Sequence, residues 1–270
     1  MADPAPLPAR PAATVMVVRD AAAGVEVFML RRHTGAAFAA GNYVFPGGRV
    51  DELDGADGLG ECCDGPDDAA ASDLLGVERG GLAFLVAAIR ECFEESGLLL
   101  AHRRDGAPLP APAAADRVAV HDGALSMLAL CRRDGLVLDT AALRYVAHWV
   151  TPEEERTRRF DTRFFLAPAP PDHHEGVHDD VETIDSVWTT PAEAMRRGLA
   201  GEIMVMPPTM AGLELLDGCA TVADALAKAD GLGRPARIEP HLVFDDDGRV
   251  LGAAIGDRIM PIVVGPRSER

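Results

Sequence analysis

The sequence predicts a layered fold of the mixed α/β or α+β class. Segments with strand character precede, separate and follow segments with helix character, a pattern typical of sheets covered by helices. The 270 residues are 48% hydrophobic, which is enough for a sizeable core in one large domain or in one domain with an extension.

The first half of the chain is expected to hold two strands and one long helix. Residues 14–20 (TVMVVRD) and 25–32 (VEVFMLRR) predict strands joined by the small-residue turn AAAG, and the loop HTGAAFAAGNYVFPGG follows them. Residues 53–81 carry eight acidic residues and seven glycines among 29 positions, so we expect a long loop outside the core. The run from about Leu82 to Leu100 predicts a helix.

The second half alternates the two kinds of element. The expected elements are a linker at 106–115, a helix over 116–135 weakened by Gly123, strands at 143–150 and 158–167, a polar loop at 172–180 and a strand at 181–188. Thr190, Pro191 and Glu193 supply an N-cap, a first-turn proline and a capping-box glutamate for the next helix. Helices near 209–218 and 221–229 and strands at 237–244 and 249–255 are expected last.

Composition restricts the partners and the compartment. The net charge of −17, from 26 basic and 43 acidic residues, argues against nucleic acid or an anionic membrane as a main partner but leaves room for a small phosphorylated ligand. The N-terminus has no signal-peptide pattern, and no apolar run reaches membrane-spanning length. Five cysteines without a C-x-x-C pair predict reduced thiols and a cytoplasmic location.

Three glutamates crowd one face of the expected central helix. At about 100° per residue, Glu91, Glu94 and Glu95 fall within an arc of roughly 100°. Apolar residues gather on the opposite side, while the small Ala87 and Ala88 lie on the acidic face and leave room for an approaching group.

Two interpretations of the acidic face remain open at this point. A solvated face is the common case, although like charges at i,i+4, such as Glu91 and Glu95, cost about 0.2–0.5 kcal/mol. A divalent cation reverses that cost, and hard cations such as Mg²⁺ prefer carboxylate, water and phosphate oxygens. The clustering therefore favours a metal site that handles phosphate.

The string Arg90-Glu91-Cys92-Phe93-Glu94-Glu95-Ser96-Gly97-Leu98 resembles the second half of the Nudix box, R-E-U-x-E-E-x-G-U with U apolar. Gly48, after Pro46-Gly47, resembles its opening glycine. This resemblance implies a Nudix αβα sandwich with a mixed β-sheet and a C-terminal helical extension. It also implies metal-assisted attack of water on a diphosphate linked to another group.

The spacing of the box departs from the family pattern G-x5-E-x7-R. Arg90 follows Gly48 by 42 positions in place of 14, and counting back from Arg90 places Leu82 where the first-half glutamate belongs. An interrupted box is similar to that of the peroxisomal coenzyme A diphosphatases of mammals, as are GNYVFPGGRVDELD and HWVTPEEERTRRFDTRFFLA, although this chain ends in PRSER and lacks a Ser-Lys-Leu-type address. The expected organisation is a flexible terminus at 1–13, a Nudix domain at 14–200 with the insert 53–81, and an extension at 201–270 packed on it.

The resemblance assigns roles residue by residue. Glu91, Glu94, Glu95 and the carbonyl of Gly48 or Gly47 would hold Mg²⁺ or Mn²⁺, and Arg90 would orient the glutamates. Glu182, six positions before Trp188, is either the base or metal ligand expected on a loop or a surface residue, with Asp179 and Asp180 as rivals. The candidates for binding substrate phosphate are Arg31, Arg32, Arg49 and Arg159, together with Arg158 and Arg163.

Three functions stay open from the sequence. The first is a diphosphatase of coenzyme A or its thioesters, which releases adenosine 3′,5′-bisphosphate and a phosphopantetheine. The second is hydrolysis of another nucleoside diphosphate derivative, such as ADP-ribose, NADH or a dinucleoside polyphosphate. The third is a non-catalytic nucleotide-binding module. The expected partner is a small molecule in each case, and a homodimer is an open alternative to a monomer.

Overall fold

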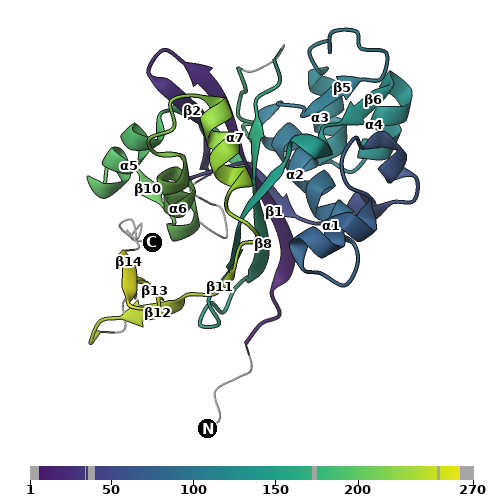
Figure 1. Ribbon diagram of the computed structural model, residues 1–270. Helices are drawn as coiled ribbons and strands as arrows, with labels where there is room; N and C mark the ends of the chain where they lie inside the picture. Colours follow the sequence, from purple (N-terminus) through teal and green to yellow (C-terminus); the bar gives the residue numbers. More distant parts are fainter. Residues whose placement is uncertain (1–5, 34, 36–39, 172–174, 248–249, 262–270) are drawn as a thin grey trace.

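A computed structural model describes residues 6–33, 35, 40–171, 175–247 and 250–261 (Figure 1). Within these residues a nine-stranded mixed sheet runs in the order β10-β3-β2-β1-β8-β7-β11, with β4 also pairing with β1 and β9 with β2. Its strands are β1 (Arg10–Ala21), β2 (Gly24–Arg32), β3 (Asn42–Val44), β4 (Gly47–Arg49), β7 (Arg144–Val150), β8 (Phe160–Pro168), β9 (Thr183–Thr189), β10 (Met204–Val205) and β11 (Arg237–Ile238).

Helices cover both faces of this sheet, as the predicted αβα sandwich requires (Figure 1). The helices are α1 (Asp68–Leu75), α2 (Gly81–Ser96), α3 (Ala114–His121), α4 (Met127–Asp134), α5 (Pro191–Leu199), α6 (Pro207–Leu216) and α7 (Val222–Asp230). Alternate residues of β1 face opposite layers: Val15 and Val17 join the apolar cluster that contains α2, whereas Met16 and Val18 join the cluster with α6 and α7. The sheet is therefore buried on both sides, and the fold class is confirmed.

The helix α2 is buried almost all round. It begins at Gly81 and ends at Ser96, four residues before the end predicted at Leu100. The next residue, Gly97, stops it with a φ of 73° and an N–H bond to the Phe93 carbonyl. Ala87 and Ala88 are fully buried in the apolar cluster shared with β1, so the expectation that they leave room for an approaching group is wrong. Glu94 and Glu95 are buried as well, so the acidic face is not a solvated one.

The insert is folded, and the expectation that 53–81 is a loop outside the core is wrong. It forms two short 3-10 turns, η1 (Glu52–Gly55) and η2 (Leu59–Cys62), followed by α1. Leu59, Cys62, Ala71 and Leu75 are buried in the same apolar cluster as α2. The sequence holds the reason: Asp67 caps α1 by accepting from Ala70 N–H, and Ala71 and Leu75 are spaced one turn apart, so they share a buried face.

Other boundaries also differ from the sequence prediction. Residues 10–13 belong to β1 and not to a flexible terminus, because β1 pairs with β8 from Arg10 onward. The helix expected over 116–135 is split into α3 and α4, with Gly123 at a φ of 70° between them. Glu193 pairs with Arg196 and does not complete a capping box, although Thr190 caps α5 as expected.

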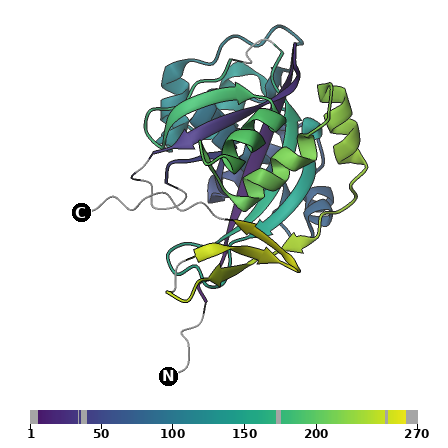
Figure 2. The ribbon, with the colours of Figure 1, turned by 90° about the vertical axis from the view of Figure 1, so that its left-hand side faces the viewer.

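The C-terminal extension contains strands as well as helices. A three-stranded antiparallel sheet of β12 (His241–Phe244), β13 (Val250–Ile255) and β14 (Arg258–Pro261) follows α6 and α7, and lies below α6 in Figure 1 and below the helices in Figure 2. A two-stranded antiparallel sheet of β5 (Ala101–Arg103) and β6 (Leu136–Leu138), and the turn η3 (Thr140–Ala142), complete the fold. No helix in the described part of the chain has the length and apolarity to cross a bilayer. Parts of the predicted segments 1–13, 33–48, 172–180, 201–270 and 249–255 lie outside the described residues.

Candidate active site

The two halves of the interrupted motif meet in space. Gly47 and Gly48 lie on β4, which pairs with β1 beside the C-terminal half of α2, and Gly47 N–H donates to Glu95 Oε2 at 2.9 Å. A Cβ atom at Gly48 would lie 2.5 Å from the carboxyl atoms of Glu91, so a larger residue here would displace the Glu91 carboxylate. The prediction that the insert does not separate Gly48 from the glutamates is confirmed.

Arg90 forms hydrogen bonds with several acidic residues through one guanidinium. It donates to Glu91 Oε1 at 2.9 Å and to Glu94 Oε1 at 3.0 Å, and the second contact is an i,i+4 pair on α2. A further bond of 2.8 Å reaches the Arg49 carbonyl on β4. Burial alone would lower the pKa of Arg90, but its hydrogen bonds to Asp54 and the charges of the surrounding carboxylates raise it, so the guanidinium stays charged.

Asp54 completes this network and was missed in the sequence. Its Oδ1 and Oδ2 accept from Arg90 Nε and Nη2 at 2.8 and 2.9 Å, and only 1% of the residue is exposed. Counting back from Arg90 led to Leu82, whereas counting forward six positions from Gly48 leads to Asp54, the acidic position of G-x5-E with a shorter side chain. The insert therefore begins after this residue, and the box is complete in space.

The three glutamates are held in an environment that disfavours their charge. Burial, with the neighbouring charge of Glu94, raises the pKa of Glu91 to about 7 in spite of Arg90. Burial and the charge of Glu91 raise the pKa of Glu95 well above its usual range, and burial raises that of Glu94. Carboxylates crowded in this way gain most from an added cation, because the cation offsets both the burial and the repulsion.

The donor set fits a hard divalent cation. Every candidate ligand is an oxygen: the carboxylates of Glu91, Glu94 and Glu95 and the carbonyls of Gly47 and Gly48. The contact between Gly48 and Glu91 brings a carbonyl-bearing strand against a carboxylate, which is the arrangement that Mg²⁺ and Mn²⁺ accept.

Of the three acidic candidates on the loop before β9, only Glu182 faces the site. Arg32 Nη2 lies 3.3 Å from Glu182 Oε2, and Arg32 Nη1 lies 3.7 Å from Glu95 Oε1, so one arginine joins both carboxylates. Asp179 accepts from the N–H groups of Val181, Glu182 and Thr183 and holds the turn. Asp180 is exposed and pairs with His178, so neither rival reaches the glutamates.

A cavity of about 1010 Å³ opens beside these groups. Its acidic part contains Glu91, Glu94, Asp54 and Glu182, and the arginines on its wall are Arg10, Arg32, Arg49, Arg90 and Arg158. An apolar part is formed by Trp149, Met206, Pro207, Leu242, Val250 and Ala253. The enclosed space suits a ligand that has both a charged and a neutral end.

Three of the predicted substrate-binding arginines, Arg31, Arg159 and Arg163, do not line the cavity. Arg159 is buried and donates to the carbonyls of Thr151, Pro152 and Leu7 and to Glu239, so each of its three guanidinium nitrogens already has an acceptor within the protein. Arg31 lies next to Arg32 on β2, in register with Tyr43 and Asp185, and so faces the other side of the sheet. Arg163 is likewise buried, 5.2 Å from the ring of Phe84.

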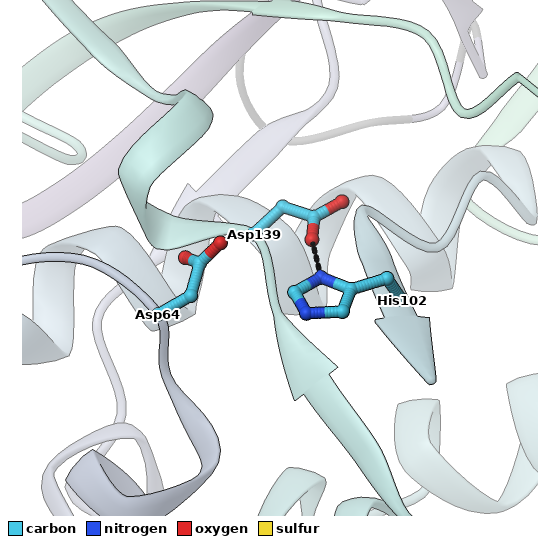
Figure 3. Close-up of side chains that lie close together, drawn as sticks. All are labelled: Asp64, His102 and Asp139. Atoms are coloured by element: carbon cyan, nitrogen blue, oxygen red, sulfur yellow. Dashed lines mark hydrogen bonds and ion pairs between the residues drawn. The ribbon is translucent and has the colours of Figure 1, made fainter. Parts of the chain in front are cut away.

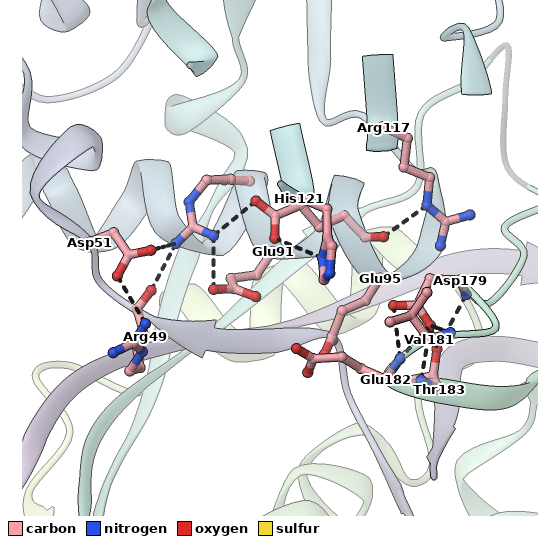
Figure 4. A network of polar contacts seen from close by, with 12 residues as sticks. Arg49, Asp51, Glu91, Glu95, Arg117, His121, Asp179, Val181, Glu182 and Thr183 are labelled. Atoms are coloured by element: carbon pink, nitrogen blue, oxygen red, sulfur yellow. Dashed lines mark hydrogen bonds and ion pairs between the residues drawn. The ribbon is translucent and has the colours of Figure 1, made fainter. Parts of the chain in front are cut away.

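Helix α3 adds two residues that the sequence did not single out. His121 Nδ1 lies 3.6 Å from Glu94 Oε2 on the cavity wall, and Arg117 donates to the Glu94 carbonyl at 2.8 Å (Figure 4). Because α3 and α2 are separate helices, no spacing rule within one helix links these positions.

Asp64, His102 and Asp139 form a second cluster outside the cavity (Figure 3). Their nearest ligand atoms lie within 4.8 Å of one another, and His102 Nδ1 lies 2.5 Å from Asp139 Oδ1. Asp64 Oδ1 accepts from Ala141 N–H at 2.8 Å, and Gly65 N–H donates to Thr140 Oγ1 at 2.9 Å. These contacts tie the insert to the chain between β6 and β7.

A mixed sheet between two helical layers, with a glycine strand against a carboxylate helix, defines the Nudix class. The family model described as the NUDT19 Nudix domain matches residues 67–216, more than half of the chain, and the chain therefore belongs to the Nudix hydrolase family. A crystal structure of a Nudix hydrolase from Alicyclobacillus acidocaldarius is 28% identical, covers 85% of this chain and 99% of its own, and superposes with a TM-score of 0.68.

Two curated relatives carry the same printed name, acyl-coenzyme A diphosphatase NUDT19. The one from Gallus gallus is 31% identical over 68% of this chain and 58% of its own length. The one from Homo sapiens is 31% identical over 75% of this chain and 63% of its own length. The matched region thus spans about three fifths of each relative.

Proposed function

We propose that the protein hydrolyses the diphosphate of coenzyme A or acyl-coenzyme A in a divalent-cation-dependent reaction, giving adenosine 3′,5′-bisphosphate and phosphopantetheine or its acyl thioester. The observation that carries this proposal is the cavity, whose lining includes Gly48 and Glu91, five arginines and a set of apolar residues. The names of the two curated relatives support the same substrate class.

The reaction is attack of a water oxygen on one phosphorus, cleavage of the bond to the bridging oxygen, and departure of the second phosphate. A bound cation would neutralise charge on the diphosphate and acidify the attacking water. Glu91, Glu94 and Glu95 hold that cation in our proposal, and Arg90 fixes their carboxylates through its bonds to Glu91 and Glu94.

Glu182 is the proposed acceptor of the water proton. It lies on the cavity wall with 48% of its side chain exposed, so water can reach it, and Arg32 holds it beside Glu95. An exposed carboxylate can release the proton to solvent after each turnover.

Arg49 and Arg158 are the proposed contacts for the 3′-phosphate, joined by Arg10. All three are exposed residues on the cavity wall, unlike Arg31 and Arg159. A guanidinium can bind phosphate through paired N–H donors, which favours arginine in this role.

We propose that the cation is Mg²⁺ or Mn²⁺. We also propose that the protein is located in the cytoplasm. The five cysteines carry free thiols, and burial raises the pKa of Cys92 and Cys131 to about 12 and of Cys63 to about 11, so these three thiols are protected from oxidation. The proposal includes a homodimer as an alternative to a monomer, and sedimentation of the purified protein, which measures its mass in solution, tests this.

Turnover of a substrate panel tests the proposal. The purified protein is incubated with Mg²⁺ or Mn²⁺ and coenzyme A, dephospho-coenzyme A, ADP-ribose, NADH or a dinucleoside polyphosphate, and products are identified by mass. Adenosine 3′,5′-bisphosphate from coenzyme A, formed faster than AMP from dephospho-coenzyme A, supports it. Faster cleavage of ADP-ribose or a dinucleoside polyphosphate replaces coenzyme A with that substrate, and binding without turnover favours the non-catalytic module.

A further inference from the structure

We propose that the inner face of the three-stranded sheet β12–β14 binds the acyl-pantetheine arm of the substrate. This inference rests on the proposed function and assigns a role to strands that come after α7, outside the sandwich. Its evidence is the register of the sheet, its anchoring, and the apolar residues that the sheet contributes to the lining of the cavity.

The register places three apolar residues in one row across the sheet. Leu242 of β12 pairs with Ala253 of β13, and Ala253 pairs with Met260 of β14. Directly paired residues share a face, so this row points to one side. Leu242 and Ala253 line the cavity, while Met260 is 5% exposed and packs in the apolar cluster that contains Met16.

The sheet is fixed against the domain at both ends. At the β12 end, β11 pairs with β7, and Glu239 accepts from the buried Arg159. At the β14 end, Arg258 Nη2 lies 2.6 Å from Glu214 Oε1 on α6. The buried role of Arg159 therefore has a consequence for the site, because it holds the strand that carries Leu242 at the cavity.

The distribution of charge in coenzyme A favours the apolar wall of the cavity as the binding site of its pantetheine arm. Coenzyme A carries its charge on the nucleotide and the diphosphate, whereas the pantetheine arm is long and neutral. With the diphosphate at Glu91 and Glu94 and the 3′-phosphate on the exposed arginines, the neutral arm is left to the apolar part of the cavity. Leu242, Ala253 and Pro207 supply carbon atoms there, and burying the arm against them is favourable.

The test replaces Leu242 by Asp and compares it with Ile259→Asp, which places the same charge on the same sheet. Ile259 is 57% exposed and pairs with Ala254 in the neighbouring row, so its side chain points away from the cavity. Calorimetry measures the affinity of each protein for decanoyl-phosphopantetheine, which has no nucleotide, and for adenosine 3′,5′-bisphosphate, which has no arm. Kinetics with decanoyl-coenzyme A and coenzyme A accompany the binding data.

We expect Leu242→Asp to weaken decanoyl-phosphopantetheine binding and to raise KM for decanoyl-coenzyme A about tenfold, while adenosine 3′,5′-bisphosphate binding changes less than about twofold. Ile259→Asp should match the wild type. Equal decanoyl-phosphopantetheine affinity in all three proteins, with coenzyme A still cleaved, overturns the inference and leaves the proposed function intact. A wild type that leaves coenzyme A uncut overturns the proposed function and the inference with it. If Leu242→Asp does not fold, Leu242→Asn takes its place and is judged by the same affinities.

Discussion

Asp54 and Arg90 hold each other through two hydrogen bonds of 2.8 and 2.9 Å, although they are 36 positions apart in the sequence. The pair joins the two halves of the interrupted motif, and both residues are buried. Asp54→Ala removes one partner of a buried pair, so we expect the free energy of unfolding to fall by about 3 kcal/mol.

Urea unfolding measures this loss, and Asp51→Ala is the matched control. Asp51 lies 4.0 Å from the same guanidinium with half of its side chain exposed, so its removal should cost less than about 1 kcal/mol. Equal losses for the two variants would show that burial does not distinguish the two pairs.

Gly48→Ala should abolish most activity. The new Cβ would lie 2.5 Å from the Glu91 carboxyl atoms, so the side chain of this proposed metal ligand would have to move. A displacement of about 1 Å at a reacting centre can lower the rate about 100-fold. Gly60→Ala, in the insert, meets only Leu82 Cδ2 at 3.6 Å, an ordinary contact, and should keep wild-type rates in the same assay.

Glu95→Gln should remove turnover while the protein stays folded. The amide oxygen of glutamine can still accept from Gly47 N–H, and a neutral side chain relieves the crowding of buried carboxylates. The lost cation contact should cost several factors of ten in kcat, each equivalent to about 1.36 kcal/mol of barrier. Near-wild-type rates at saturating Mg²⁺ would remove Glu95 from the proposed metal site, and Glu193→Gln on the exposed part of α5 controls for the substitution itself.

Cation affinity should rise with pH through about 7. Burial raises the pKa of Glu91 to about 7 and that of Glu95 well above its usual range, so the cation-free protein keeps protons on these groups at mildly acidic pH. A cation must displace those protons, so binding releases them and tightens as they leave with rising pH. Titration calorimetry with Mn²⁺ in two buffers of different ionisation enthalpy counts the protons, and an affinity that is constant between pH 6 and 8 would contradict the prediction.

Arg49 and Arg159 should separate binding from stability. Arg49→Ala should lower kcat/KM for coenzyme A about tenfold and leave dephospho-coenzyme A nearly unchanged, because its exposed guanidinium is proposed to contact the 3′-phosphate. Arg159→Ala should lower the melting temperature, since three backbone carbonyls and Glu239 lose their donor. A change in 3′-phosphate preference with Arg159→Ala alone would reverse the two assignments.

The sequence was sufficient for the fold class and for the acidic helix because both depend on local periodicity. The spacing of Glu91, Glu94 and Glu95 places them on one face of α2, and strand segments in chain order predict a covered sheet. Gly48 was found because the family pattern names a glycine. The contact between Gly48 and Glu91, which explains why a glycine is needed there, is seen only in the structure.

The remaining predictions were limited because the sequence does not show which polar side chains are buried. Arg32 and Arg159 are both arginines near apolar strands, yet one reaches Glu95 and the other is held by backbone carbonyls. The insert was predicted as a loop because of its many charges and glycines, whereas Leu59, Cys62, Ala71 and Leu75 are buried in the core. Asp54 was missed because the position of the acidic residue was counted back from Arg90, across an insertion of unknown length.

The ends of the insert meet: a Cβ atom at Gly55 would lie 3.7 Å from Cβ of Ala83. Because the insert starts and ends at nearly the same point, it need not displace β4 before it or α2 after it. The length of the insert can therefore vary. This position is therefore a natural graft point, where another segment could replace 56–80 if it covered the same side of α2. Searches that require a contiguous motif would overlook proteins built in this way, whereas a search for the spatial arrangement of glycine, aspartate, arginine and glutamates would find them.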